Sequence, residues 1–164
     1  KEATCREAGY TGDKVCTVCK QTIEKGTEVK ALGHNYVKGV CTRCDAKQPG
    51  YNPFTDVKKG PYYDAILWAY CNGVTNGISD TVFGVDNGCT RAQIVTFLYR
   101  AAGSPELAKD AANPFSDVSD SSVYYNAILW AVEKKITTGV TETTFVPNDT
   151  CTRAQAVTFL YRAK

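Results

Sequence analysis

Between residues 51 and 164, apolar side chains recur at the spacing expected of amphipathic helices. One stripe follows the spacing i, i+3, i+4, i+7 and consists of Tyr63, Ile66, Leu67 and Tyr70. A second stripe consists of Ile94, Phe97, Leu98 and Ala101. Asn72-Gly73 predicts the end of the first helix, because glycine readily adopts the left-handed conformation found at helix ends. The pattern therefore predicts a helix–loop–helix unit.

This pattern occurs twice, so the chain contains an internal repeat. The matching segments are PFTDV and PFSDV at 53–57 and 114–118, YYDAILWA and YYNAILWA at 62–69 and 124–131, and CTRAQ at 89–93 and 151–155. Lys134-Lys135 replaces the Asn-Gly pair in the second copy, so we expect that helix to end differently, by Gly139. Neither helix pair can bury its stripe alone, so the copies are expected to pack on each other or on a partner.

Residues 1–48 show no helical period and are rich in Gly, Thr, Lys and Cys. Such a segment is too short and too polar to be held together by apolar burial alone, and it needs a covalent or metal cross-link. Gln48-Pro49-Gly50 then reads as a linker. The sequence predicts four parts, namely a Cys-rich domain at 1–48, a first repeat at 51–102, a linker at 103–113 and a second repeat at 114–164.

The Cys-rich segment contains two CxxC pairs that predict a structural zinc ribbon. The predicted ligands are Cys16, Cys19, Cys41 and Cys44, with Cys5 and His34 as alternates. The order TC…G…CxxC…GH also resembles small Cys-rich repeats of exported Firmicutes proteins, which implies a rival set of Cys5, Cys16, Cys19 and His34. Disulfides are one alternative to a metal, because an exported protein can be oxidised, and reduced free thiols are the other. A zinc ion with four protein ligands would leave no position open for catalysis.

Each CTRAQ segment predicts the start of a helix. The capping boxes are formed by Thr90 with Gln93 and by Thr152 with Gln155. Arg91 and Arg153 then lie in the first helical turn, where the helix dipole disfavours a cation. Each arginine either pairs with a carboxylate, for which Asp56 and Asp117 are the obvious partners, or joins the free N–H groups in an anion site.

F-(T/S)-D-V, a helix with ILWA, (N/T)G and a TRAQ helix start follow one another twice, and this order resembles S-layer homology repeats. The resemblance covers 53–102 and 114–163. It implies a mainly α fold of two helix–loop–helix repeats with short extended stubs, beside a small Cys-rich, zinc-ribbon-like β/loop domain. In the family, repeats commonly group in threes and bind cell-wall polysaccharide that carries acidic groups. Here Gln replaces the usual Glu of TRAE, and two repeats are present.

The resemblance also implies functional residues. Arg91 and Arg153 would contact an acidic sugar group. Aromatic side chains would stack on sugar rings, and the candidates are Trp68, Trp130, Tyr62 and Tyr124. A place in the helix core is the alternative for both tryptophans. Asp56 and Asp117 would orient either the arginines or the F-x-D-V stubs.

The formal charge of +2 is spread along the chain, which argues against a nucleic-acid partner. No apolar run reaches the roughly 18 residues that span a bilayer. The single histidine lies among cysteines, and no paired-carboxylate motif is found, so we expect no enzyme activity. Starting at Lys1 without any methionine, the chain is expected to be a piece of a longer protein.

The sequence therefore predicts a module that anchors an exported protein to the cell wall of a Gram-positive bacterium, outside the cell. Its partner would be an acidic wall polysaccharide, and self-association is one way to complete a three-repeat bundle. The alternative is a module that binds a host protein or another surface subunit.

Overall fold

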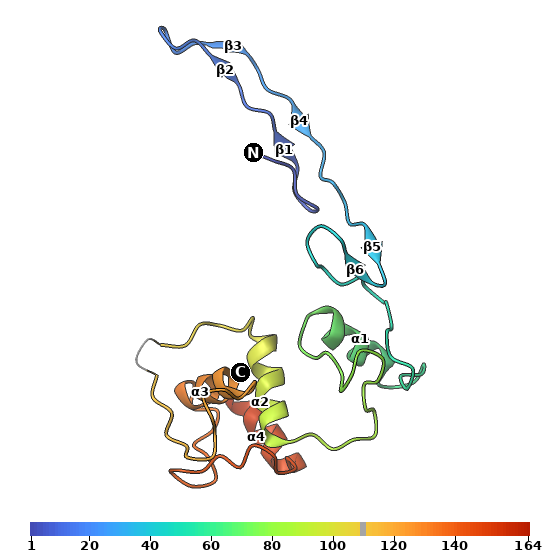
Figure 1. Ribbon diagram of the computed structural model, residues 1–164, viewed down its shortest axis with the longest axis vertical. Helices are drawn as coiled ribbons and strands as arrows, with labels where there is room; N and C mark the ends of the chain where they lie inside the picture. Colours follow the sequence, from blue (N-terminus) through green and yellow to red (C-terminus); the bar gives the residue numbers. More distant parts are fainter. Residues whose placement is uncertain (109–110) are drawn as a thin grey trace. The chain divides into compact units, whose positions relative to one another are not determined.

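The computed structural model describes residues 1–108 and 111–164, which divide into two compact units, Lys1–Pro53 and Phe54–Lys164 (Figure 1). The predicted linker at 103–113 includes residues 109–110, which lie outside the described part. Helices occupy 24% of the chain, and all of them lie in the second unit. The expectation of a mainly α chain is therefore not met over the whole length, because the first unit contains only short antiparallel strand pairs.

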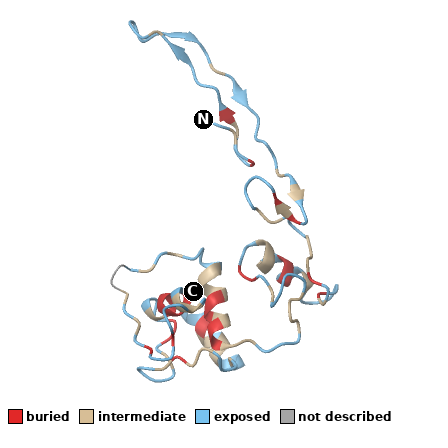
Figure 2. Ribbon diagram, in the orientation of Figure 1, coloured by how far each residue is buried: buried red, intermediate tan, exposed pale blue. Residues whose placement is uncertain are grey.

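The first unit consists of three two-stranded antiparallel sheets. Their pairs are β1 (Gly9–Tyr10) with β4 (Glu28–Val29), β2 (Lys14–Val15) with β3 (Thr22–Glu24), and β5 (Tyr36–Val37) with β6 (Val40–Cys41). Figure 1 shows β1 to β4 as one long ribbon, with the turn between β2 and β3 at its tip. The buried apolar side chains of this unit are Cys5 and Cys41 (Figure 2). A ribbon with so small a core needs another source of stability.

The second unit contains two helices in each repeat. They are α1 (Tyr63–Cys71), α2 (Arg91–Ala101), α3 (Tyr125–Glu133) and α4 (Arg153–Arg162). α2 packs against both helices of the second repeat. The main core cluster consists of Ala92, Val95, Phe115, Val118, Ile128, Trp130, Ala131, Ile136, Phe145 and Phe159, so it draws on both repeats. A smaller cluster in the first repeat consists of Phe54, Val57 and Ile66. The two copies thus pack on each other, as the repeat pattern predicts.

The buried face of α2 differs from the predicted stripe. Its buried residues are Arg91, Ala92, Val95 and Thr96, whereas Ile94, Phe97 and Leu98 are half-buried and Ala101 is exposed. The face is rotated because α2 is covered by α3 and α4, which belong to the other repeat. None of the described helices is both long and apolar enough to cross a membrane.

The helix starts agree with the sequence, and one helix end does not. Thr90 and Thr152 each form the predicted capping box with the glutamine three residues later. α1 ends at the predicted Asn72, and Gly73 follows with φ 72°. α3 already ends at Lys134, well before Gly139. There Lys135 takes the left-handed conformation, with φ 57°, although a side chain disfavours it.

Candidate functional site

The first turn of α2 is built into the second repeat. The backbone N–H of Arg91 donates to the carbonyl of Asp149 at 2.9 Å, and that of Ala92 donates to the carbonyl of Pro147 at 3.0 Å. Thr90 and Thr150 form an isolated antiparallel bridge beside them. The N–H groups that a helix start leaves without helical partners are therefore used here to join the repeats.

The Arg91 side chain is also part of this junction, with only 4% of the residue exposed. Its Nε donates to the carbonyl of Phe145 at 3.0 Å. The guanidinium carbon lies 4.9 Å from the ring centroid of Phe145 and 5.5 Å from that of Phe159, within cation–π range. Burial lowers the pKa of Arg91, while nearby Cys151, Asp149 and Asp117 act to raise it. The ion pairs among the described residues do not include Arg91, so its guanidinium is not directly paired with a described carboxylate.

Arg91 lines a cavity of about 330 Å³ in the second repeat, which we call the second cavity. Its polar lining comes from the loop after α3 and from α4, and includes Thr137, Gln155, Thr158 and Arg162. Arg162 is held by a hydrogen bond from Nη1 to the carbonyl of Ile136 at 3.2 Å. Among the described residues, two arginines and no carboxylate line this cavity, so it is suited to an anionic group.

The first repeat has an equivalent cavity of about 460 Å³, which we call the first cavity. Its lining includes Gln93, Thr96 and Arg100 from α2, and Arg100 donates to the carbonyl of Val74 at 3.4 Å. Tyr124 adds an aromatic face. Arg100 is the single arginine of this lining, because no counterpart of Arg91 enters it.

Asp56 and Asp117 hold the F-x-D-V stubs in place. Asp117 accepts from the backbone N–H of Phe145 at 2.9 Å and of Val146 at 2.7 Å, and Asp56 makes equivalent bonds to Phe83, Gly84 and Val85. The N–H of Phe83 is the main reason that the pKa of Asp56 lies below its ordinary value. Burial acts to raise the pKa of Asp117, but the two N–H donors outweigh it and the pKa is lowered. Of the two predicted roles, these bonds match the orientation of the stubs.

The remaining residues predicted from the sequence lie in different environments. Trp130 is buried, and its ring centroid lies 5.6 Å from that of Tyr99. Trp68 and Tyr62 are exposed. Arg153 is exposed and lines neither cavity.

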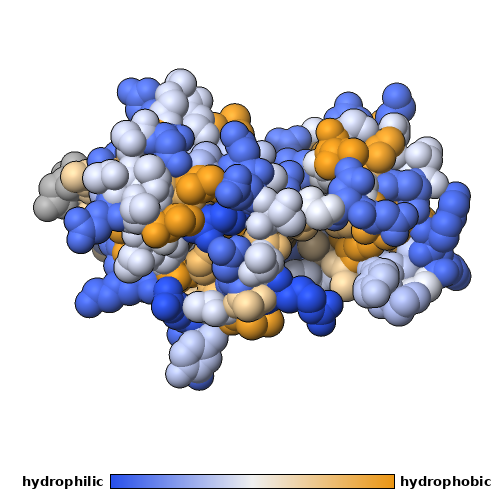
Figure 3. All heavy atoms as spheres, turned by 90° about the horizontal axis from the view of Figure 1, so that it is seen from below, coloured by the Kyte–Doolittle hydropathy of each residue, from blue (hydrophilic) through white to orange (hydrophobic). Residues whose placement is uncertain are grey.

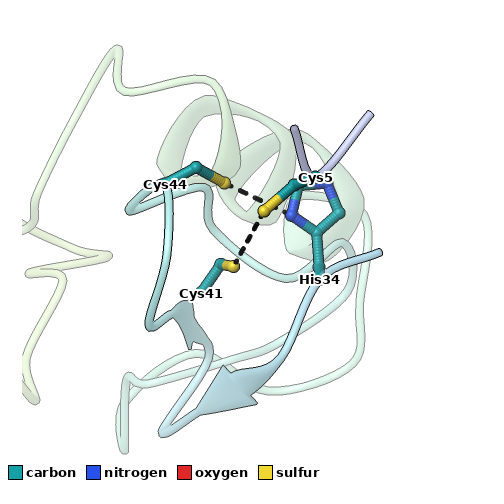
Figure 4. Close-up of side chains that lie close together, drawn as sticks. All are labelled: Cys5, His34, Cys41 and Cys44. Atoms are coloured by element: carbon teal, nitrogen blue, oxygen red, sulfur yellow. Dashed lines mark hydrogen bonds between the residues drawn. The ribbon is translucent and has the colours of Figure 1, made fainter. Parts of the chain in front are cut away.

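A different site lies in the first unit, where Cys5, His34, Cys41 and Cys44 point toward one another (Figure 4). Their ligand atoms all lie within 4.8 Å of one another. The Sγ atoms of Cys5 and Cys41 are 3.9 Å apart, and Cys44 Sγ lies 3.4 Å from His34 Nδ1. Three sulfurs and one imidazole nitrogen form a Cys₃His set, one of the common structural metal sites.

Backbone hydrogen bonds bring these four residues together. The tight turn at Cys41 is closed by the N–H of Asp45, which donates to the carbonyl of Cys41 at 3.0 Å. Arg43, in the middle of this turn, donates through Nη1 to the carbonyls of Leu32 and Gly33, just before His34. Leu32 in turn donates its N–H to the carbonyl of Thr4 at 2.8 Å, which places Cys5 at the same end of the ribbon.

The thiols of this cluster differ in acidity. The backbone N–H of Arg43 is the main cause that lowers the pKa of Cys41 to about 5, with a contribution from His34. Burial, followed by the hydrogen bonds to Cys44 and Cys41, raises the pKa of Cys5 to about 11. Closely spaced thiolates repel one another, and a bound cation would relieve that repulsion.

The structure groups Cys41 and Cys44 with the two alternates, Cys5 and His34. The predicted ribbon set is not brought together, because Cys16 and Cys19 lie in the turn between β2 and β3 and are not part of the cluster. All five cysteines of this unit have free thiols. The TC…G…CxxC…GH order pointed to Cys5 and His34, but the rival set that it implied also contains Cys16 and Cys19, which lie outside the cluster.

The comparisons with known proteins agree with the helical architecture. The family model described as "S-layer homology domain" matches residues 53–95 and 114–157, more than half of the chain. The chain belongs to this family. Family membership and the relatives below identify it as an extracellular, cell-wall-associated protein of Gram-positive bacteria.

Several curated proteins are similar to the repeats. A "Cell surface protein" of Thermoanaerobacter kivui is 39% identical over 115 residues, which covers 68% of this chain and 15% of that protein. An "Endoglucanase" of Bacillus sp. (strain KSM-635) is 37% identical over 112 residues, covering 68% of this chain and 12% of that protein. A "Middle cell wall protein" of Brevibacillus brevis is 32% identical over 93 residues, covering 56% and 9%. The chain therefore spans only a small part of these relatives. The family and the surface proteins indicate an anchoring module rather than a catalytic one.

Proposed function

We propose that residues 54–164 hold the parent protein on the cell wall by binding an anionic group of a wall polysaccharide in the second cavity. The observation that carries this proposal is the lining of that cavity, to which the described part of the chain contributes Arg91 and Arg162 but no carboxylate. A guanidinium binds a carboxylate through charge-assisted hydrogen bonds, whereas a neutral sugar gains much less from two arginines.

Each residue of the two cavities would contact a different part of the polymer. Nε of Arg91 is occupied by Phe145, so its terminal nitrogens would donate to the anionic group. Thr158 and Gln155 would bind sugar hydroxyls. Tyr124 would stack on a sugar ring in the first cavity, which has one arginine where the second cavity has two. In a single chain, the exposed side chains predicted from the resemblance would contact the polymer outside the cavities, and they are Arg153, Trp68 and Tyr62. Trp130, Asp56 and Asp117 would support the site indirectly.

The test is co-sedimentation with purified cell walls, before and after acid extraction of their secondary polymers. The wild-type chain should pellet with intact walls and stay in solution with extracted walls. Arg162→Gln should weaken binding about tenfold or more, because one charge-assisted contact is worth about 1.5–3 kcal/mol. Arg6→Gln is the matched control, since Arg6 is an exposed arginine of the first unit and lines neither cavity. Equal losses in the two variants, or pelleting with extracted walls, would contradict the proposal.

We further propose that the cluster in the first unit binds Zn²⁺ as a structural ion. Two sulfurs bound to one zinc at about 2.3 Å and a tetrahedral angle lie about 3.8 Å apart. The distance between Cys5 and Cys41 is 3.9 Å. Four protein ligands leave no open position, so the ion would stabilise the fold and would take no part in catalysis.

Metal analysis of the purified chain, with two matched variants, tests this assignment. Cys44→Ser should lower the zinc content well below one ion per chain, and Cys19→Ser should leave it unchanged, because Cys19 is outside the cluster. Loss of zinc in both variants would instead support the ribbon set. Retention in both would mean that the cluster does not hold the ion.

A further inference from the structure

The two repeats present the same helix face in opposite environments. On α2, Val95 is fully buried, and Leu98 and Tyr99 pack against the main core cluster. On α4 the equivalent residues are exposed, with fractions of 61%, 56% and 67% for Val157, Leu160 and Tyr161. The view in Figure 3 shows hydrophobic patches, in orange, between hydrophilic residues, in blue. We call Arg153, Val157, Leu160 and Tyr161 the α4 docking face.

The first helices of the two repeats show the complementary difference. Trp130 on α3 is buried and packs against Tyr99 of α2. Trp68 occupies the same position on α1 and is 59% exposed. Among the described residues, no helix of another repeat covers it in the way that α2 covers Trp130. We call Trp68 and the segment 83–88 that leads into α2 the α1 receiving face.

Backbone groups repeat this asymmetry. Arg91 and Ala92 donate their N–H groups to the carbonyls of Asp149 and Pro147. The equivalent donors on α4 belong to Arg153 and Ala154, and no acceptor for them is found in the described parts of the chain. The carbonyls that correspond to Pro147 and Asp149 are those of Val85 and Asn87, and they accept no hydrogen bond from a described residue. Over its described residues, each molecule therefore has free N–H donors on α4 and free carbonyl acceptors in the segment 83–88. These are the two sides of the contact that its own repeats already make.

We propose that the α4 docking face of one molecule binds the α1 receiving face of a second copy, reproducing the contact between the two repeats. In this arrangement Arg153 would enter the first cavity of the second copy, as Arg91 lines the second cavity. Tyr161 would pack on Trp68, as Tyr99 packs on Trp130. The structure favours a second copy as the occupant. In sequence, α4 corresponds to α2 and α1 corresponds to α3, and α2 and α3 already form such an interface within the chain. Because the two faces differ, the contact is head-to-tail.

The association would complete a site. The first cavity has one arginine in a single chain and would gain a second one from the partner copy. It would then resemble the second cavity, which binds the anionic group in the proposed function above. This part of the inference rests on that proposed function, whereas the association itself does not.

The test uses the whole chain and two variants that each disable one face. Val157→Asp disables the α4 docking face, and Trp68→Asp disables the α1 receiving face; both positions are exposed, so the fold should tolerate them. Sedimentation velocity should show concentration-dependent oligomers for the wild type and monomers for each variant alone. An equimolar mixture should form 1:1 dimers that do not grow, because only one compatible pair of faces remains. Val18→Asp is the control, because Val18 is an exposed valine of the first unit and its replacement should leave association unchanged.

A wild-type chain that stays monomeric at every concentration would overturn the proposal, as would a mixture that forms no dimer. So would a Val18→Asp variant that dissociates like the other two, since a general charge effect would then explain the losses. The wild-type chain separates the two proposals. A wild-type chain that stays monomeric but pellets with intact walls would refute the docking of a second copy alone, and one that associates but does not pellet would refute the proposed function alone.

Discussion

Residues 1–53 and residues 54–164 are held together in different ways. In the first unit, the buried apolar side chains are two cysteines, and both belong to the Cys₃His cluster. In the second unit, a core of aromatic and aliphatic side chains joins both repeats. Burial of apolar area can support the helices, whereas an extended ribbon without such a core depends on cross-linking.

The largest expected effect is that of removing the proposed zinc ion. A strong chelator should unfold residues 1–53 and leave residues 54–164 folded, because metal binding supplies folding free energy only where the ligands are. Amide hydrogen exchange on the whole chain checks this. Protection should be lost in β5 and β6 and kept in α2 and α3. Loss of protection in the helices would show that the two units do not differ as described.

A core substitution should destabilise the second unit and leave the first unit unaffected. Phe145→Ala should destabilise the second unit by about 3–5 kcal/mol, because a fully buried ring is lost from the main cluster. Phe83→Ala, at the same position of the first repeat, should cost less because Phe83 is only half-buried. Urea unfolding followed by helical circular dichroism measures both values, and zinc content should be unaffected. Equal costs would mean that the two repeats share the core more evenly than their burial indicates.

Acid should weaken the second unit through its stub carboxylates. The pKa of Asp117 is lower in the folded chain than its ordinary value, so its stabilising effect is present at neutral pH and is lost as the pH falls through the folded pKa. Asp117→Asn should therefore reduce Tm at pH 7, and the difference from wild type should shrink below about pH 4. Thermal melts across that range test the sign. A constant difference would exclude ionisation as the cause.

The smallest expected effect concerns the end of α3. Lys135→Gly should stabilise the second unit by about 1 kcal/mol, because glycine adopts φ 57° without the steric cost of a side chain. Gly73→Lys at the equivalent position should destabilise it by a similar amount. A clash with neighbouring atoms would not explain this destabilisation, since a Cβ at Gly73 would meet no atom within 4 Å. Urea unfolding of both variants measures this, and a destabilised Lys135→Gly would contradict it.

Local features were predictable because they depend on neighbours in the chain. The capping boxes at Thr90 and Thr152 need only residues three positions apart, and the end of α1 needs only Asn72-Gly73. The end of α3 was missed because Lys135 adopts a conformation that its residue type disfavours, directly before Ile136, which is buried in the main core cluster.

By itself, the sequence determined that the chain has a Cys-rich segment and two helical repeats of the S-layer homology family, since these follow from composition, spacing and repetition. Only the tertiary structure decided that Arg91 is buried between the repeats while the identical Arg153 is exposed. It also decided that Cys41 and Cys44 meet Cys5 and His34 rather than the other CxxC pair. Identical motifs differ in this way because burial and ligand grouping depend on which segment packs against each of them, and that neighbour lies far away along the chain.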